Sequence, residues 1–76
     1  MARFPTDLSG RDVRTALERA GFVFRRQTGS HMILRREEPY ARVVDPDHKQ
    51  VRRGTLRRIV ADAGLTLEEV TKLLGR

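Results

Sequence analysis

The sequence has 76 residues, enough for one small domain with a modest core, and we expect a single domain over residues 1–76. It contains no cysteine, which excludes disulfide bonds and thiolate metal sites. No apolar run approaches membrane-spanning length and the N-terminus shows no signal-peptide pattern, so we expect a soluble cytoplasmic protein.

The first predicted element is a helix over residues 9–20. Ser9 can cap it, and Asp12, three residues later, completes a pattern similar to a capping box. Gly21 can end the helix because glycine enters the left-handed region without penalty. An apolar stripe at helical spacing is formed by Val13, Ala16, Leu17 and Ala20.

Three strands are predicted next. Residues 22–27, 31–36 and 40–45 are aromatic, β-branched or apolar in the manner of strands. Turn residues separate them at 28–30 and 37–39. The segments therefore predict a three-stranded antiparallel meander, with helices covering its apolar face.

The C-terminal third predicts a loop over residues 46–54 and two helices, over 55–64 and 65–76. The stripe of the first of these helices is Leu56, Ile59, Val60 and Ala63. Thr66 can cap the last helix. The order αβββα with one further helix predicts an α+β fold like that of double-stranded-RNA-binding domains, a three-stranded antiparallel sheet packed against helices.

Positive charge is concentrated in the middle of the chain. Lysine and arginine number 16 against 10 acidic residues, a net charge of +6. Residues 25–58 hold ten cations and four acids, whereas the flanking segments hold six of each. Fourteen of the cations are arginine, which binds phosphate in a two-pronged geometry. The pattern indicates a polyanionic partner, most simply nucleic acid; the alternative is a surface that only confers solubility.

His31 is the first candidate for chemistry, because histidine is the side chain that titrates near neutrality without perturbation. An imidazole can accept the proton of a ribose 2′-hydroxyl that attacks the adjacent phosphorus, or donate a proton to the leaving 5′-oxygen. A histidine hydrogen-bonded in a turn is the third interpretation, and the residues leave all three open. Ser30 is its neighbour on the strand and projects to the opposite face, so it cannot serve as a nucleophile activated by His31.

Phosphate-binding candidates surround the turn before His31. Gly29 permits close approach of a phosphate, and Ser30 lies beside it. The arginines that could stabilise charge on the phosphoryl oxygens are Arg25, Arg26 and Arg35.

A second basic cluster precedes the helix at 55–64. Lys49, Arg52 and Arg53 would oppose the helix dipole there unless an anion were bound, so we expect them to hold the RNA backbone.

His48 lies in the same loop and is the second histidine candidate. Asp45 or Asp47 could orient it, and a solvated loop histidine is the alternative.

From Ser9 to Val70 the sequence resembles the HicA-type toxins of bacterial toxin–antitoxin systems. The most specific pieces, in order, are Gly21-Phe22, Gly29-Ser30-His31, Pro46 with His48, and Gly54-Thr55-Leu56 leading to Ile59. One departure is Asp45, where the family usually shows an apolar strand end; an acid there could weaken phosphate binding or orient His48.

The resemblance implies an endoribonuclease that cleaves messenger RNA without a metal ion or other cofactor and arrests growth. It implies His31 as the catalytic histidine, His48 as an RNA-binding residue of open role, and neutralisation by a cognate HicB-type antitoxin. We expect the antitoxin to cover the basic surface or to insert at the histidine. No membrane or small-molecule partner is expected. The alternatives are a non-catalytic RNA-binding module of the same fold and a DNA-associated partner of a repressor.

Overall fold

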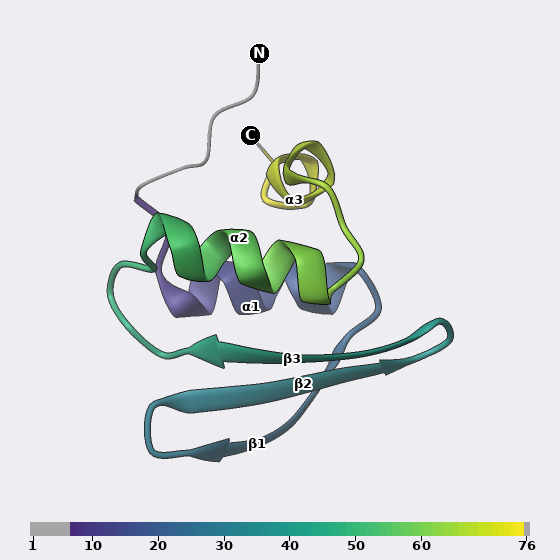
Figure 1. Ribbon diagram of the computed structural model, residues 1–76, viewed down its shortest axis with the longest axis horizontal. Coiled ribbons are helices and arrows are strands. Elements are labelled where there is room, and N and C mark those ends of the chain that lie inside the picture. The colour runs from purple at the N-terminus through teal and green to yellow at the C-terminus, as the bar shows by residue number, and fades with distance from the viewer. Residues whose placement is uncertain (1–6, 76) are drawn as a thin grey trace.

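The computed structural model describes residues 7–75, and their elements follow the predicted order (Figure 1). The elements are α1 (Gly10–Arg19), β1 (Val23–Thr28), β2 (His31–Glu37), β3 (Tyr40–Pro46), α2 (Arg53–Asp62) and α3 (Leu67–Leu73). The strands form one antiparallel sheet in the order β1-β2-β3. The predicted α+β fold is therefore confirmed. No helix in the described range is long and apolar enough to cross a membrane.

The helices lie on one face of the sheet, with α1 and α2 stacked against it (Figure 1). Met32 and Leu34 of β2 and Val43 of β3 face the helices and are buried, as strand alternation requires. The helical stripes supply the rest of the core, including Val13, Ala16, Leu17, Leu56, Ile59, Val60 and Ala63. No helix within residues 7–75 covers the opposite face of the sheet (Figure 1). We call it the open face; it contains His31, Ile33, Arg35, Arg42 and Val44 among others.

Both predicted N-terminal caps are present. The backbone N–H of Asp12 donates to Ser9 Oγ at 3.0 Å, and the N–H of Ser9 donates to Asp12 Oδ2 at 3.0 Å. Thr66 and Glu69 make the equivalent pair of bonds at the start of α3. These reciprocal bonds satisfy N–H groups that a helix start otherwise leaves without partners.

The loop after β3 is tied to the rest of the fold by backbone hydrogen bonds. Asp47 N–H donates to the Ser30 carbonyl at 2.6 Å, and Gly10 N–H donates to the His48 carbonyl at 2.8 Å. A Cβ atom at Gly10 would overlap the Pro46 carbonyl, so only glycine lets α1 approach this closely. The start of α1 and the turn before β2 together fix the position of residues 46–48.

Asp45 is a buried acid at the end of β3. It pairs with Met32 across the sheet, faces the helices and is 0% exposed. Neither carboxylate oxygen has a hydrogen-bond partner in the described chain, so the suggestion that Asp45 orients His48 is wrong. Burial, with the nearby Asp47 charge, raises the pKa of Asp45 to about 8. Asp45 thus occupies an apolar position in the core rather than a place beside a phosphate.

Candidate functional site

His31 and His48 line the same groove, which has a volume of about 640 Å³ and lies between β3 and α2. We call it the histidine groove. Its walls come from the start of β2, the open-face side chains of β3, the following loop and one side of α2. Besides the two histidines, its lining includes Arg42, Val44, Pro46, Arg52, Thr55, Arg58, Ile59 and Asp62.

Strand register explains why His31 reaches this groove. His31 is the first residue of β2 and pairs with Thr28 of β1 and Pro46 of β3. Strand alternation puts it on the open face with Ile33, and its side chain is exposed. The imidazole is therefore accessible to a substrate in the groove.

Three arginines line the histidine groove: Arg42, Arg52 and Arg58. The sequence interpretation proposed only Arg52. Strand alternation could have identified Arg42. Pro46 pairs with His31, and Arg42, four residues before Pro46, lies on the same face of β3. Arg58 lies on the exposed side of α2, and its Nε is 3.7 Å from Asp62 Oδ2.

Arg25, Arg26 and Arg35 lie elsewhere, around a hollow of about 360 Å³ on the open face. We call it the tyrosine hollow; its full lining is Arg25, Arg26, Ile33, Arg35, Tyr40 and Arg42. The structure thus separates these three predicted arginines from the groove that contains His31. Arg42 belongs to both sites and connects them.

A β-bulge brings two consecutive arginines to the tyrosine hollow. Phe24 pairs with Leu34 and Arg26 with Ile33, so Arg25 is an extra residue in β1. In a regular strand neighbouring side chains point to opposite faces, whereas the extra residue of a bulge breaks this alternation. Arg25 and Arg26 consequently line the same hollow.

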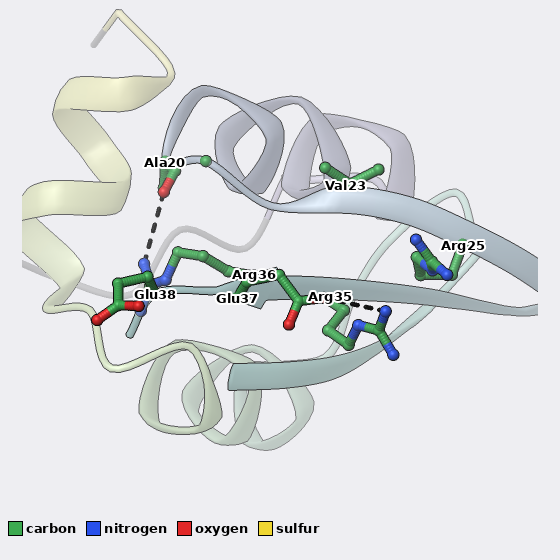
Figure 2. Close-up of a pocket in the computed structure, with 8 residues that line it drawn as sticks. Ala20, Val23, Arg25, Arg35, Arg36, Glu37 and Glu38 are labelled. Atoms are coloured by element: carbon green, nitrogen blue, oxygen red, sulfur yellow. Dashed lines mark hydrogen bonds and ion pairs between the residues drawn. The ribbon is translucent and has the colours of Figure 1, made fainter. Parts of the chain in front are cut away.

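Arg35 and Arg36 are neighbours in β2 with different roles. Arg35 lies on the open face and forms a 3.0 Å ion pair with Glu37. Arg36 turns to the helices, where it lies 4.6 Å from the centre of the Phe22 ring and donates to the carbonyls of Ala20 and Ala63. Figure 2 shows Arg36 reaching the end of α1 while Arg25 and Arg35 extend from the adjacent strands. Arg36 therefore holds elements together, and Arg35 remains at the surface.

The basic cluster before α2 surrounds an uncapped helix start. α2 begins at Arg53, two residues earlier than predicted, and Arg52 is its N-cap without a side-chain cap bond. No acid occupies the first turn. Of the three predicted cations, only Arg52 lines the histidine groove; Arg53 lines a smaller hollow beside it, and Lys49 lies exposed in the loop. Exposed N–H groups and these cations favour an anion at this end.

Gly29 and Ser30 form the turn before His31 without lining the histidine groove. Gly29 has φ of 59°, a left-handed conformation that glycine adopts without strain. Its carbonyl accepts a bond from Gln27 Nε2, and the Ser30 carbonyl accepts from Asp47. Both residues act here through their backbone, by fixing the turn.

Asp47 is bound by side chains other than His48. Its carboxylate accepts from Arg11 Nε at 3.3 Å and from Gln27 Nε2 at 3.2 Å. These two bonds, with smaller contributions from the Arg11 and His48 charges, lower the pKa of Asp47. Asp47 therefore anchors the loop to α1 and β1.

The arrangement places an exposed imidazole beside several guanidinium groups. Imidazole can transfer protons at neutral pH, and fixed cations stabilise negative charge on a phosphoryl group. Within residues 7–75, no three or more of the His, Cys, Asp and Glu side chains cluster as a metal site would require.

Comparison with known families agrees with the fold. A family model described as the HicA toxin of bacterial toxin-antitoxin matches residues 10–65, well over half of the chain. The matched segment contains every residue that lines the histidine groove and ends before α3. Among curated proteins, no match to the chain was found.

Proposed function

The chain belongs to the HicA toxin family of bacterial toxin–antitoxin systems, and we propose that it is an endoribonuclease that cleaves messenger RNA. Membership of this family makes the protein the toxin of such a system, with an antitoxin as its partner. The proposal assigns cleavage to the histidine groove, with His31 as the catalytic residue and with no metal ion or other cofactor. The observation that supports it is the exposed His31 in a groove with three arginines.

In the proposed reaction, the 2′-oxygen of a ribose attacks the adjacent phosphorus. The new P–O2′ bond forms as the P–O5′ bond breaks, which leaves a 2′,3′-cyclic phosphate and a 5′-hydroxyl. One proton leaves the 2′-oxygen and one reaches the 5′-oxygen, and His31 transfers one of these two protons. The arginines Arg42, Arg52 and Arg58 stabilise the negative charge that builds up on the phosphoryl oxygens.

The remaining predicted RNA-binding residues have supporting roles in this proposal. His48 contacts RNA in the same groove as His31, which it also lines. Lys49 and Arg53 bind the backbone near the start of α2, where no acid opposes an anion. Gly29 and Ser30 hold the turn that positions His31. Arg25, Arg26 and Arg35 bind RNA beyond the groove.

We further propose that the partner is a HicB-type antitoxin that inhibits cleavage by covering the histidine groove. An acidic segment of such a protein would bind the arginines of the histidine groove, which are the same arginines that RNA phosphates would contact. A titration that detects RNA and antitoxin bound together, with cleavage intact, would refute this blocking arrangement.

The test compares the parent with His31→Ala on a labelled RNA in the presence of EDTA. We expect a loss of about 100-fold or more in cleavage rate, since a proton-transfer group contributes about 10²–10⁴. RNA binding and thermal stability should stay unchanged, because His31 is exposed. Lys72→Gln, on α3 away from the groove, is the control and should cleave normally.

Three other results would contradict parts of this assignment. Equal cleavage by parent and His31→Ala removes His31 from catalysis. If the parent binds RNA and does not cleave it, the protein is a non-catalytic RNA-binding module of the same fold. Cleavage that EDTA abolishes indicates a metal-dependent reaction.

A further inference from the structure

We propose that the tyrosine hollow is a nucleobase-binding subsite, in which the Tyr40 ring stacks on a base of single-stranded RNA next to the cleavage position. This inference rests on the proposed function and adds to it a second contact area with a different chemistry. The histidine groove would hold the reacting phosphate, and the tyrosine hollow a neighbouring base.

The first support is the exposure of Tyr40 on a face without helices. Its residue surface is 63% exposed, although a tyrosine ring is large and mostly apolar. Val23 and Val44 are 57% and 40% exposed. The register puts both on the same face as Tyr40, and they complete the set of exposed large apolar side chains within residues 7–75. The open face thus offers exposed apolar side chains beside the ring.

The second support is the charge around the ring. Four arginines line the tyrosine hollow with Tyr40 and Ile33: Arg25, Arg26, Arg35 and Arg42. Of these four arginines, only Arg35 forms an ion pair with a described residue, which is Glu37. The hollow thus offers positive charge for an anion and an aromatic ring for a flat apolar group. A nucleotide has both, in its phosphate and its base.

The third support is continuity with the histidine groove. Tyr40, Arg42, Val44 and Pro46 alternate along the same face of β3. Pro46 lies six positions after Tyr40, a span of about 20 Å at the usual rise of a strand. Arg42 lies between them and lines both sites. An RNA strand along β3 would thus pass from the groove to the hollow over one shared arginine.

The geometry favours a single strand over a duplex. Bases in a duplex are stacked on each other and their faces are inaccessible, whereas an unpaired base can stack on an aromatic side chain. Tyr40 offers one such ring at the edge of an open sheet. Stacking tolerates any base, so the subsite should add affinity with little sequence preference.

Tyr40 also provides a fluorescence signal with which RNA binding can be measured. It is the only tyrosine and the chain has no tryptophan, so intrinsic fluorescence excited in the tyrosine band reports on Tyr40. The full chain is used with His31→Ala, which prevents loss of the RNA by cleavage. The probes are oligoadenylate of about eight nucleotides, within the usual range for single-strand sites, and an abasic ribose-phosphate oligomer of equal length and charge.

We expect oligoadenylate to quench the Tyr40 fluorescence and the abasic oligomer to bind without comparable quenching. Tyr40→Leu should weaken binding of oligoadenylate by about 5- to 150-fold, the usual effect of removing one stacking ring, and leave the abasic affinity unchanged. Tyr40→Phe, the matched control, keeps the ring and should bind like the parent. Arg42→Gln should weaken binding of both probes.

Equal binding of the two probes, or equal oligoadenylate binding by Tyr40→Leu and the parent, overturns the inference. If Tyr40→Leu loses the antitoxin but not RNA, the face belongs to the protein partner. When RNA is cleaved in a His31-dependent way and Tyr40 has no effect, only this inference fails. When neither cleavage nor RNA binding is found, the proposed function fails with it.

Discussion

Asp47 N–H donates a 2.6 Å hydrogen bond to the carbonyl oxygen of Ser30. The bond joins the loop that carries His48 to the turn that precedes His31, so the two histidines enter one groove from segments held together by the backbone. A groove built in this way depends on the loop position, and the loop position depends on contacts outside the groove.

Gly10→Ala tests that dependence. The added methyl group would overlap the Pro46 carbonyl, so residues 46–48 must shift. We expect a loss of about 1–3 kcal/mol in unfolding free energy, as for other overpacked sites, and slower RNA cleavage. Urea unfolding and the cleavage assay measure the two effects.

Gly54→Ala is the matched control for stability. An added Cβ there meets nothing within 4 Å, and the residue lies in the first turn of α2. Stability should be unchanged or rise by up to about 1 kcal/mol. Equal stability of Gly10→Ala and the parent would show that the α1–loop contact does not constrain the groove.

Asp45 predicts an unusual dependence of stability on pH. Its folded pKa of about 8 lies above the ordinary aspartate pKa of 3.8, so between these two pH values the folded state retains a proton that the unfolded state has lost. The contribution of the protonated Asp45 to the free energy of unfolding is complete below about pH 4. It falls by on the order of 1.4 kcal/mol per pH unit as the pH rises, and it is lost once the pH passes through about 8.

Asp45→Asn removes this titration. We expect the variant to be more stable than the parent near pH 8, with the advantage shrinking toward pH 4, in urea unfolding at several pH values. Asp62→Asn, an exposed acid on α2, is the control and should follow the parent. Parallel pH profiles for Asp45→Asn and the parent would contradict the burial of a neutral carboxyl group.

Arg42→Gln should slow RNA cleavage and weaken RNA binding, because Arg42 lines both the histidine groove and the tyrosine hollow. The salt dependence of binding should also lose about one unit of slope, as expected when one phosphate contact is removed. Lys72→Gln removes the same charge from α3 and should leave both measurements unchanged. A loss of slope in both variants would indicate a general charge effect.

Arg35→Gln and Arg36→Gln should separate binding from folding. Arg36 bonds to the carbonyls of Ala20 and Ala63 and lies over Phe22, so its replacement should lower stability by about 1–3 kcal/mol. Replacement of Arg35 should weaken RNA binding at nearly unchanged stability. Thermal unfolding and RNA affinity distinguish the two, and the reverse pattern would contradict the assigned orientations.

The sequence predicted local features well because local residues determine them. The capping box of Ser9 and Asp12 and the stripe through Leu56 and Ile59 depend on spacings of three and four residues. The start of α2 was missed by two residues because Gly54 was interpreted as a helix breaker. Near a helix start, glycine costs little, since the first N–H groups have no helical partner.

Features that depend on pairing between strands were not predicted. The bulge at Arg25 arises from the match of β1 to β2 and puts Arg25 beside Arg26 at the tyrosine hollow, whereas neither lines the groove of the histidine that they were expected to flank. The burial of Asp45 likewise follows from its place opposite Met32 under the helices. Arg42 was overlooked because its neighbours in the groove come from other elements.

The bulge at Arg25 makes the length of β1 a determinant of surface charge. Removing that single residue would restore regular alternation in β1 without altering the pairing of Arg26 with Ile33. Phe24 would keep its place opposite Leu34, and the tyrosine hollow would lose one of its arginines. One inserted amino acid thus adds a fourth arginine to the tyrosine hollow while Phe24 stays on the helix side of the sheet.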